Sequence, residues 1–331
     1  MTNTFKALQA AETDGRFDMS VVTRSTDELP DGDVLIKVHY SSLNYKDAMS
    51  ASGNRSISKN YPHTPGIDVA GIVEESSADE WKAGDSVIVT GFDLGMNTSG
   101  GFGGYVRVPA DWIVRLPEGL SLRESMIYGT AGFTAALSVQ AILKHGVKPK
   151  DGMIAVSGAT GGVGSVAVSI LNRLRYRVAA ISSKESSHEF LRNIGASEII
   201  SREEMEDTSG KPMLKSRFAA AVDTVGGIVL TTILKSLSYG GIVTACGLVN
   251  GTDLPLTIFP FIIKGIHLAG IDSVNLPIEQ RPPVWEFLAG DWKPHDLEQL
   301  VTEIGLEELR EHIEQILKGQ MTGRALVNLR R

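Results

Sequence analysis

The residues with the clearest chemistry form a glycine-rich segment near the middle of the chain, Ala155-Val-Ser-Gly-Ala-Thr-Gly-Gly-Val-Gly164. An apolar run precedes this segment and an apolar helical pattern follows it, which is the context in which such a turn binds a dinucleotide. Glycines let backbone N–H groups approach a pyrophosphate, and a helix N-terminus adds partial positive charge. The alternative is a glycine-rich turn of an ordinary α/β protein. We predict a dinucleotide site with contacts from Thr160, Gly161, Gly162, Val163 and Gly164.

Two further expectations concern individual residues of this segment. The hydroxyls of Ser157 and Thr160 are expected to donate to phosphate oxygens, because they flank the turn. Gly164 is expected to allow close packing of the helix on the preceding strand, which is the role of the last glycine in such turns.

The residues after the next predicted strand select the nucleotide. This strand covers residues 178–181 and is followed by Ser182, Ser183 and Lys184, with the first acid only at Glu185. NAD-specific sites place an acid at the strand end, where it holds the ribose 2′-hydroxyl. Two hydroxyls and a lysine suit a 2′-phosphate instead. We therefore predict NADPH as the cofactor.

The elements around this motif alternate between strand and helix. Apolar strand candidates cover residues 153–157, 177–181, 219–222, 242–245 and 266–270, and helical patterns lie between them. This alternation predicts an α/β domain with a doubly wound parallel sheet. Ligands of such sheets bind at the carboxyl ends of the strands. Three residues that follow later strands are therefore expected to line the nicotinamide: Gly247, Leu248 and Ser273.

The flanking segments have a different character. Short strand candidates with turns between them, at residues 34–40, 67–74, 86–90 and 105–108, predict a β-rich barrel or sandwich. The tail from residue 276 reads as amphipathic helices and a last strand at 325–329 that return to this domain. The expected division is a β-rich catalytic domain, residues 1–124 and 268–331, and a nucleotide domain, residues 125–267.

Composition excludes several classes of function. The chain has 331 residues, 42% of them hydrophobic, and a net charge of −7, which disfavours a general nucleic-acid-binding surface. Cys246 is its one cysteine, so an intramolecular disulfide and a zinc site of several thiolates are both excluded. No apolar run has the length of a membrane span and no leader pattern is present, so no membrane association and a cytoplasmic location are expected.

Several separate motifs resemble the medium-chain dehydrogenase/reductase superfamily, in its zinc-free quinone oxidoreductase branch. The glycine segment, Pro65-Gly-Ile-Asp-Val-Ala-Gly71 and Gly129-Thr-Ala-Gly-Phe-Thr-Ala135 carry the general likeness. A narrower resemblance, to the YhdH/YhfP-type quinone oxidoreductases that include acrylyl-CoA reductases, rests on residues 41–47, 223–227, 245–248 and 272–274. The likeness covers essentially the whole chain. It implies a Rossmann domain inserted in a GroES-like, β-rich catalytic domain.

The resemblance also implies a reaction. Members transfer hydride from NADPH to an activated double bond, in an enone or a short enoyl-CoA such as acrylyl-CoA, or to a quinone. Gly66-Ile-Asp68 stands where zinc members carry Gly-His-Glu, so no metal is expected. Asp68 itself is expected to have a structural role. A non-catalytic NADPH-binding sensor or binding module is the alternative from another class.

Reduction of a conjugated carbonyl forms an enolate, which needs hydrogen-bond donors and a proton. In the resemblance, the loop with Asn44 and Tyr45 faces the nicotinamide, so Tyr45 is expected to donate to the carbonyl or contact the cofactor. Asn44 is expected either to orient a ligand or to form a turn. Arg55 replaces the tyrosine donor of related enoyl reductases. We expect it to bind a carboxylate, a thioester oxygen or a CoA phosphate, or to be an ordinary surface arginine, and Lys59 has the same ambiguity.

Three more expectations follow from the family likeness. Thr130 is placed near the cofactor, or serves as a helix cap. Arg324 is expected to contact the cofactor from the returning tail. The protein is expected to form a homodimer through edge strands of the nucleotide domain, for which the apolar residues 254–266 are candidates.

Overall fold

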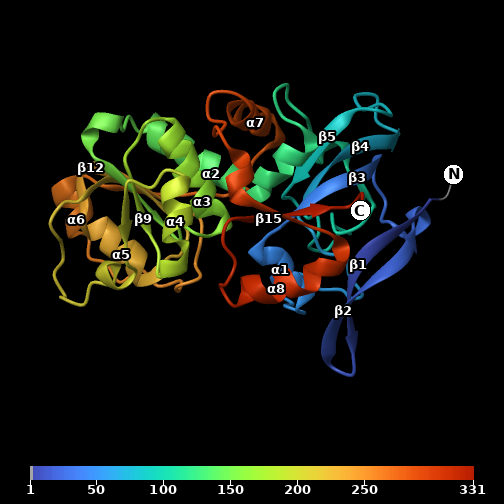
Figure 1. Ribbon diagram of the computed structural model, residues 1–331, viewed down its shortest axis with the longest axis horizontal. Coiled ribbons are helices and arrows are strands. Elements are labelled where there is room, and N and C mark those ends of the chain that lie inside the picture. Colours follow the sequence, from blue (N-terminus) through green and yellow to red (C-terminus); the bar gives the residue numbers. More distant parts are fainter. Residues whose placement is uncertain (1–2) are drawn as a thin grey trace. The chain divides into compact units, whose positions relative to one another are not determined.

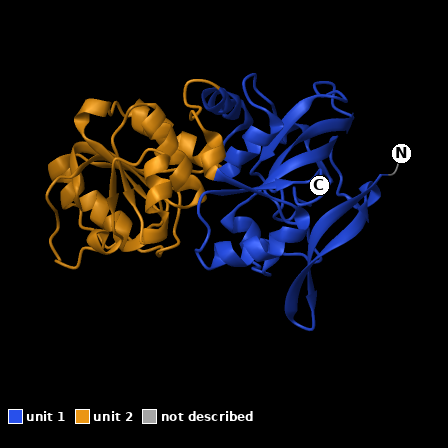
Figure 2. Ribbon diagram, viewed as in Figure 1, with its two compact units in different colours: residues 1–130, 274–289, 301–331 blue, residues 131–273, 290–300 orange. Residues whose placement is uncertain are grey.

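The computed structural model describes residues 3–331. They divide into two compact units, coloured separately in Figure 2. Unit 1 comprises residues 1–130, 274–289 and 301–331, and unit 2 comprises residues 131–273 and 290–300. The boundaries therefore lie six residues beyond those expected from the sequence, at 130 and 273, and a short piece of the tail belongs to the nucleotide unit.

Unit 2 contains a parallel sheet whose described strands follow the order β10-β9-β8-β11-β12-β13. Strands β9 and β12 of this sheet are labelled in Figure 1. The order reverses between β8 and β11, which is the doubly wound arrangement, so the predicted Rossmann fold is confirmed. Strands β9 and β11 are buried throughout, as expected for strands covered on both faces. The strand bounds are β8 Met153–Ser157, β9 Val178–Ile181, β10 Glu198–Ile200, β11 Phe218–Asp223, β12 Leu237–Ala245 and β13 His267–Gly270.

The helices of unit 2 follow its strands along the chain. They are α3 Gly162–Arg173, α4 His188–Asn193, α5 Gly227–Lys235 and α6 Phe259–Lys264. The expectation that residues 254–266 form an edge strand is wrong, because this segment is a loop that leads into α6. Pro260 in the first turn suits a helix start and removes the amide that a strand would need. The edge strand is β13.

Unit 1 is built around a sheet in which the described strands follow the order β14-β15-β3-β4-β5-β7, with β6 also paired to β3. The C-terminal strand β15 pairs directly with β3, which confirms that the tail returns to the first domain. A separate hairpin of β1 and β2 was not predicted. The bounds are β1 Thr4–Thr13, β2 Arg16–Ser25, β3 Val34–Leu43, β4 Asp68–Ser76, β5 Ser86–Thr90, β6 Tyr105–Val108, β7 Ile113–Arg115, β14 Val301–Ile304 and β15 Arg324–Asn328.

The helices of unit 1 are α1 Tyr45–Ala51, α7 Arg281–Ala289 and α8 Leu309–Leu317. Helices α1 and α8 lie side by side (Figure 1). Their contact joins the end of β3 to the returning tail, because α1 follows β3 directly and α8 precedes β15.

Helix α2, Leu122–Lys144, runs from unit 1 into unit 2 and is interrupted at Gly129. There φ is +51°, and a Cβ atom would lie 2.2 Å from Oγ of Ser42 and 2.4 Å from Oδ2 of Asp68, so only glycine fits. The helix is long and apolar enough to cross a membrane, but 72% of its most apolar window is buried. It is therefore a core helix.

Candidate functional site

The glycine-rich segment forms a tight turn between β8 and α3. The Gly161 amide donates to the Gly158 carbonyl at 2.9 Å, and α3 begins at Gly162. A Cβ atom on Gly164 would lie 2.3 Å from the Gly158 carbonyl oxygen, so a side chain would push the helix away from the turn. The expectation that Gly164 allows close packing is therefore confirmed. The turn leaves the first amides of a 12-residue helix available for an anion.

A buried carboxylate, Asp223 at the end of β11, holds this turn in place. Its Oδ1 accepts from Oγ of Ser157 at 2.7 Å, and its Oδ2 accepts from the Gly226 amide at 2.8 Å. Burial raises the pKa of Asp223. Hydrogen bonds from the Ser157 hydroxyl and from the amides of Gly226 and Val225 lower this pKa and so oppose the effect of burial. The hydroxyl hydrogen of Ser157 is thus used inside the protein, and the expectation that it donates to a phosphate is wrong. The sequence signal for Asp223 was its position before two glycines at a strand end.

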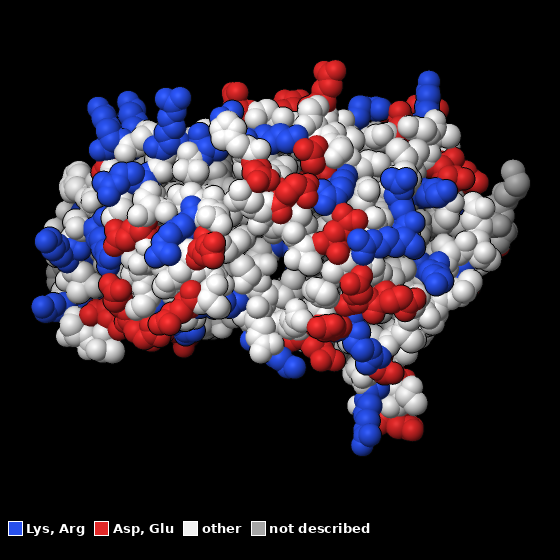
Figure 3. Space-filling model, viewed as in Figure 1, with Lys and Arg blue, Asp and Glu red and all other residues white. Residues whose placement is uncertain are grey.

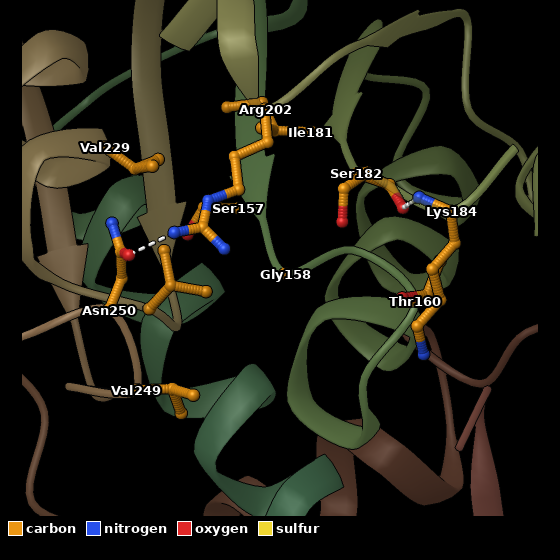
Figure 4. Close-up of a pocket in the computed structure, with 12 residues that line it drawn as sticks. Ser157, Gly158, Thr160, Ile181, Ser182, Lys184, Arg202, Val229, Val249 and Asn250 are labelled. Carbon is orange, nitrogen blue, oxygen red and sulfur yellow. Dashed lines mark hydrogen bonds between the residues drawn. The ribbon is translucent and has the colours of Figure 1, made fainter. Parts of the chain in front are cut away.

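Beside the turn lies a cavity of about 130 Å³, shown in Figure 4. Four of the predicted cofactor residues line it together: Thr160, Ser182, Ser183 and Lys184. The Thr160 hydroxyl has no hydrogen-bond partner within residues 3–331 and is available to a ligand. The Lys184 amide donates to Oγ of Ser182 at 3.1 Å, which fixes the turn after β9. The remaining lining residues are Ser157, Gly158, Ile181, Arg202, Val225, Val229, Val249 and Asn250.

Arg202 is a cavity residue that the sequence interpretation missed. It follows the three-residue strand β10, which was too short to recognise. Its Nε donates to Glu206 at 2.7 Å, and an Nη atom donates to the side-chain oxygen of Asn250 (Figure 4). The amide nitrogen of Asn250 is buried without a partner in the described chain. Arg202 therefore adds a second cation to Lys184 on this cavity, and Asn250 adds a donor.

Three predicted nicotinamide residues lie outside this cavity. Gly247 and Leu248 follow β12, and Leu248 is 66% exposed. Ser273 is buried and its hydroxyl accepts from Oγ1 of Thr134 at 2.7 Å. Their contact with a nicotinamide stays a prediction.

In unit 1, the buried carboxylate of Asp68 is the centre of a hydrogen-bond network. Its Oδ2 accepts from Oγ of Ser42 at 2.5 Å and from the side-chain amide of Asn44 at 2.7 Å. Its Oδ1 accepts from the hydroxyl of Thr130 at 2.6 Å, and the Thr130 amide donates at 2.9 Å. These bonds do not show Thr130 as a helix cap, because its amide and its hydroxyl both donate to Asp68, which acts as the structural acceptor. A contact of Thr130 with the cofactor stays a prediction.

Arg324 belongs to the same network and is 3% exposed. One Nη donates to Oγ of Ser42 at 2.8 Å, the other to Oδ1 of Asn44 at 3.3 Å, and Nε donates to the Ile127 carbonyl at 3.0 Å. Burial lowers the pKa of Arg324, and the charge of Asp68 opposes this change. Three predicted site residues, Asn44, Thr130 and Arg324, are therefore brought together here.

The loop that carries Tyr45 is fixed by a second buried carboxylate, Asp47. Its Oδ2 accepts from the Asn44 amide at 2.7 Å, and its Oδ1 accepts from the Ile67 amide at 2.8 Å. Burial, followed by the nearby charge of Asp68, raises the pKa of Asp47 to about 7. Tyr45 is 43% exposed, at the start of α1. Tyr45 is thus presented by a segment whose other polar groups are hydrogen-bonded to one another.

Comparison with known proteins agrees with this architecture. Residues 30–118 match the family of alcohol dehydrogenase GroES-like domains, and residues 162–290 match the zinc-binding dehydrogenases. The probable acrylyl-CoA reductase AcuI of Escherichia coli K12 is 45% identical over 98% of this chain and 99% of its own.

Two solved structures are similarly close. YhdH of Escherichia coli K-12 with bound NADPH has a TM-score of 0.94 at 45% identity, covering 98% of this chain and 99% of its own. YhfP of Bacillus subtilis with bound NAD has a TM-score of 0.96 at 44% identity, with the same coverage. This chain belongs to the medium-chain dehydrogenase/reductase family, in the AcuI/YhdH/YhfP subgroup.

The zinc chemistry of other medium-chain dehydrogenases does not fit this chain. Within residues 3–331, no three His, Cys, Asp or Glu side chains converge as metal ligands. Burial raises the pKa of Cys246 to about 12, so its thiol is protonated at neutral pH and is a poor ligand and nucleophile. Ile67 stands beside Asp68 where the zinc-dependent members carry histidine.

Arg55, where related enoyl reductases of the family carry a tyrosine, is engaged with the chain's own groups. One Nη forms an ion pair with Glu12 at 2.5 Å, and the other donates to the Lys59 carbonyl at 2.5 Å. The guanidinium also lies 5.1 Å from the ring centre of Tyr61 and 5.6 Å from that of Phe17. These contacts tie the β1–β2 hairpin to the loop after α1. A part for Arg55 in substrate binding stays a prediction.

Proposed function

We propose that this protein is an NADPH-dependent reductase of activated carbon–carbon double bonds, with a short enoyl-CoA such as acrylyl-CoA as the leading substrate class. The observation that carries the proposal is the cavity beside the glycine turn, where two cations, two serines and Thr160 meet in one unit. Full-length similarity to a probable acrylyl-CoA reductase supports the substrate class.

NADPH supplies a hydride when it is bound. The amides at the start of α3 and the Thr160 hydroxyl would hold its pyrophosphate. Ser182, Ser183, Lys184 and Arg202 would hold the 2′-phosphate, because charge-assisted bonds from two cations favour a doubly charged group. A relative that binds NAD has been crystallised, so the strength of this preference is the quantity to measure.

On the substrate side, the side chains in unit 1 supply orientation and hydrogen-bond donors. Reduction at the β-carbon of an enoyl thioester places negative charge on the carbonyl oxygen, and a donor at that oxygen lowers the barrier. We propose Tyr45 for this role, because its hydroxyl lies on a rigid loop and is partly exposed. Asn44 acts as a positioning residue, since both ends of its side-chain amide are bound to Asp68 and Arg324.

A quinone reductase is the second candidate within the enzyme class, and a non-catalytic NADPH sensor is the candidate outside it. The discriminating experiment follows NADPH oxidation with acrylyl-CoA, crotonyl-CoA and a simple quinone in parallel. Turnover of the thioesters supports the proposal, whereas turnover of the quinone alone replaces it with quinone reduction. Tight NADPH binding without turnover of any of the three substrates favours the sensor.

A homodimer in the cytoplasm completes the proposal. Among residues 3–331, strand β13 pairs only with β12 and forms one edge of the unit 2 sheet. The segment before it carries exposed apolar side chains, including Ile258, Phe259, Ile262 and Ile263. Such an edge with an apolar border is suited to pairing with a second copy. Sedimentation equilibrium tests this: a dimer that Ile262→Lys converts to monomer supports it, and a monomeric wild type contradicts it.

A further inference from the structure

A second cavity lies entirely within unit 1 and shares no residue with the cavity of the glycine turn. Its volume is about 810 Å³, within the range of roughly 300–1,000 Å³ of small-molecule sites. Five parts of the chain form its walls: the start of β1, the middle of β3, the start of β6 with the glycine before it, residues 305–308 and the C-terminal residues. We call it the β3 groove. It is lined by Phe5, Lys6, Lys37, Val38, His39, Gly104, Tyr105, Gly305, Leu306, Glu307, Glu308, Leu329, Arg330 and Arg331.

Backbone hydrogen bonds fix the walls of this groove. The Val38 amide donates to the Gly104 carbonyl at 2.9 Å, and the Gly104 amide donates to the Lys6 carbonyl at 3.0 Å. The Leu329 amide donates to the His39 carbonyl at 3.0 Å. These walls of the groove are therefore preformed, because main-chain bonds join Gly104 and Leu329 to β3 and join Lys6 to Gly104.

The charges that line the β3 groove do not balance. Glu307 lies 3.8 Å from Lys6, and Glu308 lies 3.5 Å from Arg331, so each acid already has a basic partner. Lys37 and Arg330 are exposed and form no ion pair with any group in residues 3–331. Two unmatched positive charges thus remain in one groove of a protein whose net charge is −7. Figure 3 shows Lys and Arg side chains interspersed with Asp and Glu over the visible surface of unit 1.

His39 lies close to both of these cations. Lys37 stands two residues before His39 on β3, and Arg330 follows Leu329, whose amide donates to the His39 carbonyl at 3.0 Å. Burial lowers the pKa of His39, and the charges of Arg330 and Lys37 lower it further. The two cations therefore lie on adjoining segments of the same groove wall, on either side of the backbone contact between His39 and Leu329. A neutral imidazole beside them can donate a hydrogen bond to an oxygen without titrating at neutral pH.

The apolar part of the groove adds a second requirement on the ligand. Leu306 and Leu329 are half-buried on its wall and provide its open apolar surface, and the buried rings of Phe5 and Tyr105 pack edge to face at 5.7 Å in the same lining. Inorganic phosphate would use the cations and leave this surface exposed. We propose that the β3 groove binds a phosphate-bearing organic ligand of the nucleoside diphosphate class, with its phosphates between Lys37 and Arg330.

The test is calorimetric titration of ADP into the full-length protein saturated with NADPH, so that the cavity of the glycine turn is occupied. The test variant is Lys37→Gln/Arg330→Gln. The control is Arg16→Gln/Lys211→Gln, which removes the same charges from exposed positions outside the groove. We expect one saturable ADP site, weakened at least tenfold in the test variant and less than twofold in the control.

The KM for acrylyl-CoA, measured in the same variants, distinguishes a free nucleotide from the nucleotide end of CoA as the ligand. This measurement rests on the proposed reductase function. An unchanged KM for acrylyl-CoA in the test variant assigns the groove to a free nucleotide. A KM raised in parallel with the loss of ADP binding assigns it to the nucleotide end of the CoA substrate. Absence of saturable ADP binding, or equal weakening in the control variant, overturns the proposal. Since ADP binding is measured without turnover, this failure is distinct from failure of the reductase assignment.

Discussion

The side-chain amide of Asn44 donates to Oδ2 of Asp68 at 2.7 Å, which joins the end of β3 to the start of β4. Both groups are buried, and Arg324 from the C-terminal strand binds the other end of the same amide. The loop that carries Tyr45 is thus held from two sides by residues distant in sequence.

Replacing Asp68 with asparagine is expected to destabilise the protein strongly. The variant removes the charge that faces buried Arg324 and leaves donors from Ser42 and Thr130 without an anionic acceptor. Breaking a buried charged network typically lowers the free energy of unfolding by about 3–5 kcal/mol. Urea denaturation measures this change. Asp79→Asn, on an exposed residue, is the control, and equal stability of the two variants would show that the network is not important.

Asp47 is expected to make stability depend on pH. Its pKa rises from 3.8 to about 7 on folding, so the folded state binds the extra proton between these values. The stabilisation is therefore complete below about pH 4 and is lost as pH rises through about 7. Between these two pH values the contribution of Asp47 to the free energy of unfolding changes by on the order of 2–4 kcal/mol.

The corresponding variant is Asp47→Asn, which cannot titrate. It also loses one acceptor, since Asp47 binds amides with both oxygens. We expect the wild type to be more stable than the variant at pH 5, and this advantage to shrink at pH 8. Urea denaturation of the wild type and the variant at pH 5 and pH 8 gives the difference in free energy of unfolding at each pH. A constant difference between the proteins would mean that Asp47 does not titrate in this range.

Cofactor preference is expected to depend on Lys184 and Arg202. Each alanine variant should weaken NADPH binding by roughly 10- to 100-fold, because each removes a charge-assisted hydrogen bond of about 1.5–3 kcal/mol, and should change NADH binding little. Fluorescence titration with each nucleotide gives the two dissociation constants, and their ratio measures the preference for NADPH over NADH. Lys211→Ala is the matched control, on an exposed residue away from the cavity. Equal losses for NADPH and NADH would remove these residues from 2′-phosphate recognition.

Tyr45→Phe is expected to lower kcat for acrylyl-CoA by about 10²- to 10³-fold while KM changes little, as for loss of one donor at an oxyanion. The fold should be unaffected, because the tyrosine is partly exposed and its hydroxyl has no partner in the described chain. Tyr239→Phe, on an 85% exposed tyrosine of unit 2, is the control. A kcat equal to that of the wild type would exclude Tyr45 from the reaction.

The sequence predicted the elements that follow strong local rules. The glycine turn, strands β8 and β5, and the return of the tail were predicted because apolar runs and glycines mark them. The hairpin of β1 and β2 was missed although the first six residues of β2 alternate between polar and apolar side chains and between exposed and half-buried positions. Strand β10 was missed because it has three residues.

The same distinction holds for the site. Ser182, Ser183 and Lys184 follow a recognisable strand, whereas Arg202 follows the unrecognised β10 and was therefore missed. The roles of Asp68 and Asp223 as acceptors depend on partners more than 60 residues away, Thr130 and Ser157, which no local pattern reveals. Long-range pairing of buried polar groups is a property of the folded chain.

The most direct test of the account is mass spectrometry of the product formed from acrylyl-CoA with NADPH deuterated at the transferable position of the nicotinamide. Hydride transfer to the double bond predicts propionyl-CoA with one deuterium on its β-carbon and a matching amount of NADP⁺. Oxidation of NADPH without a saturated thioester, or a product without deuterium at that carbon, would contradict the proposed reaction.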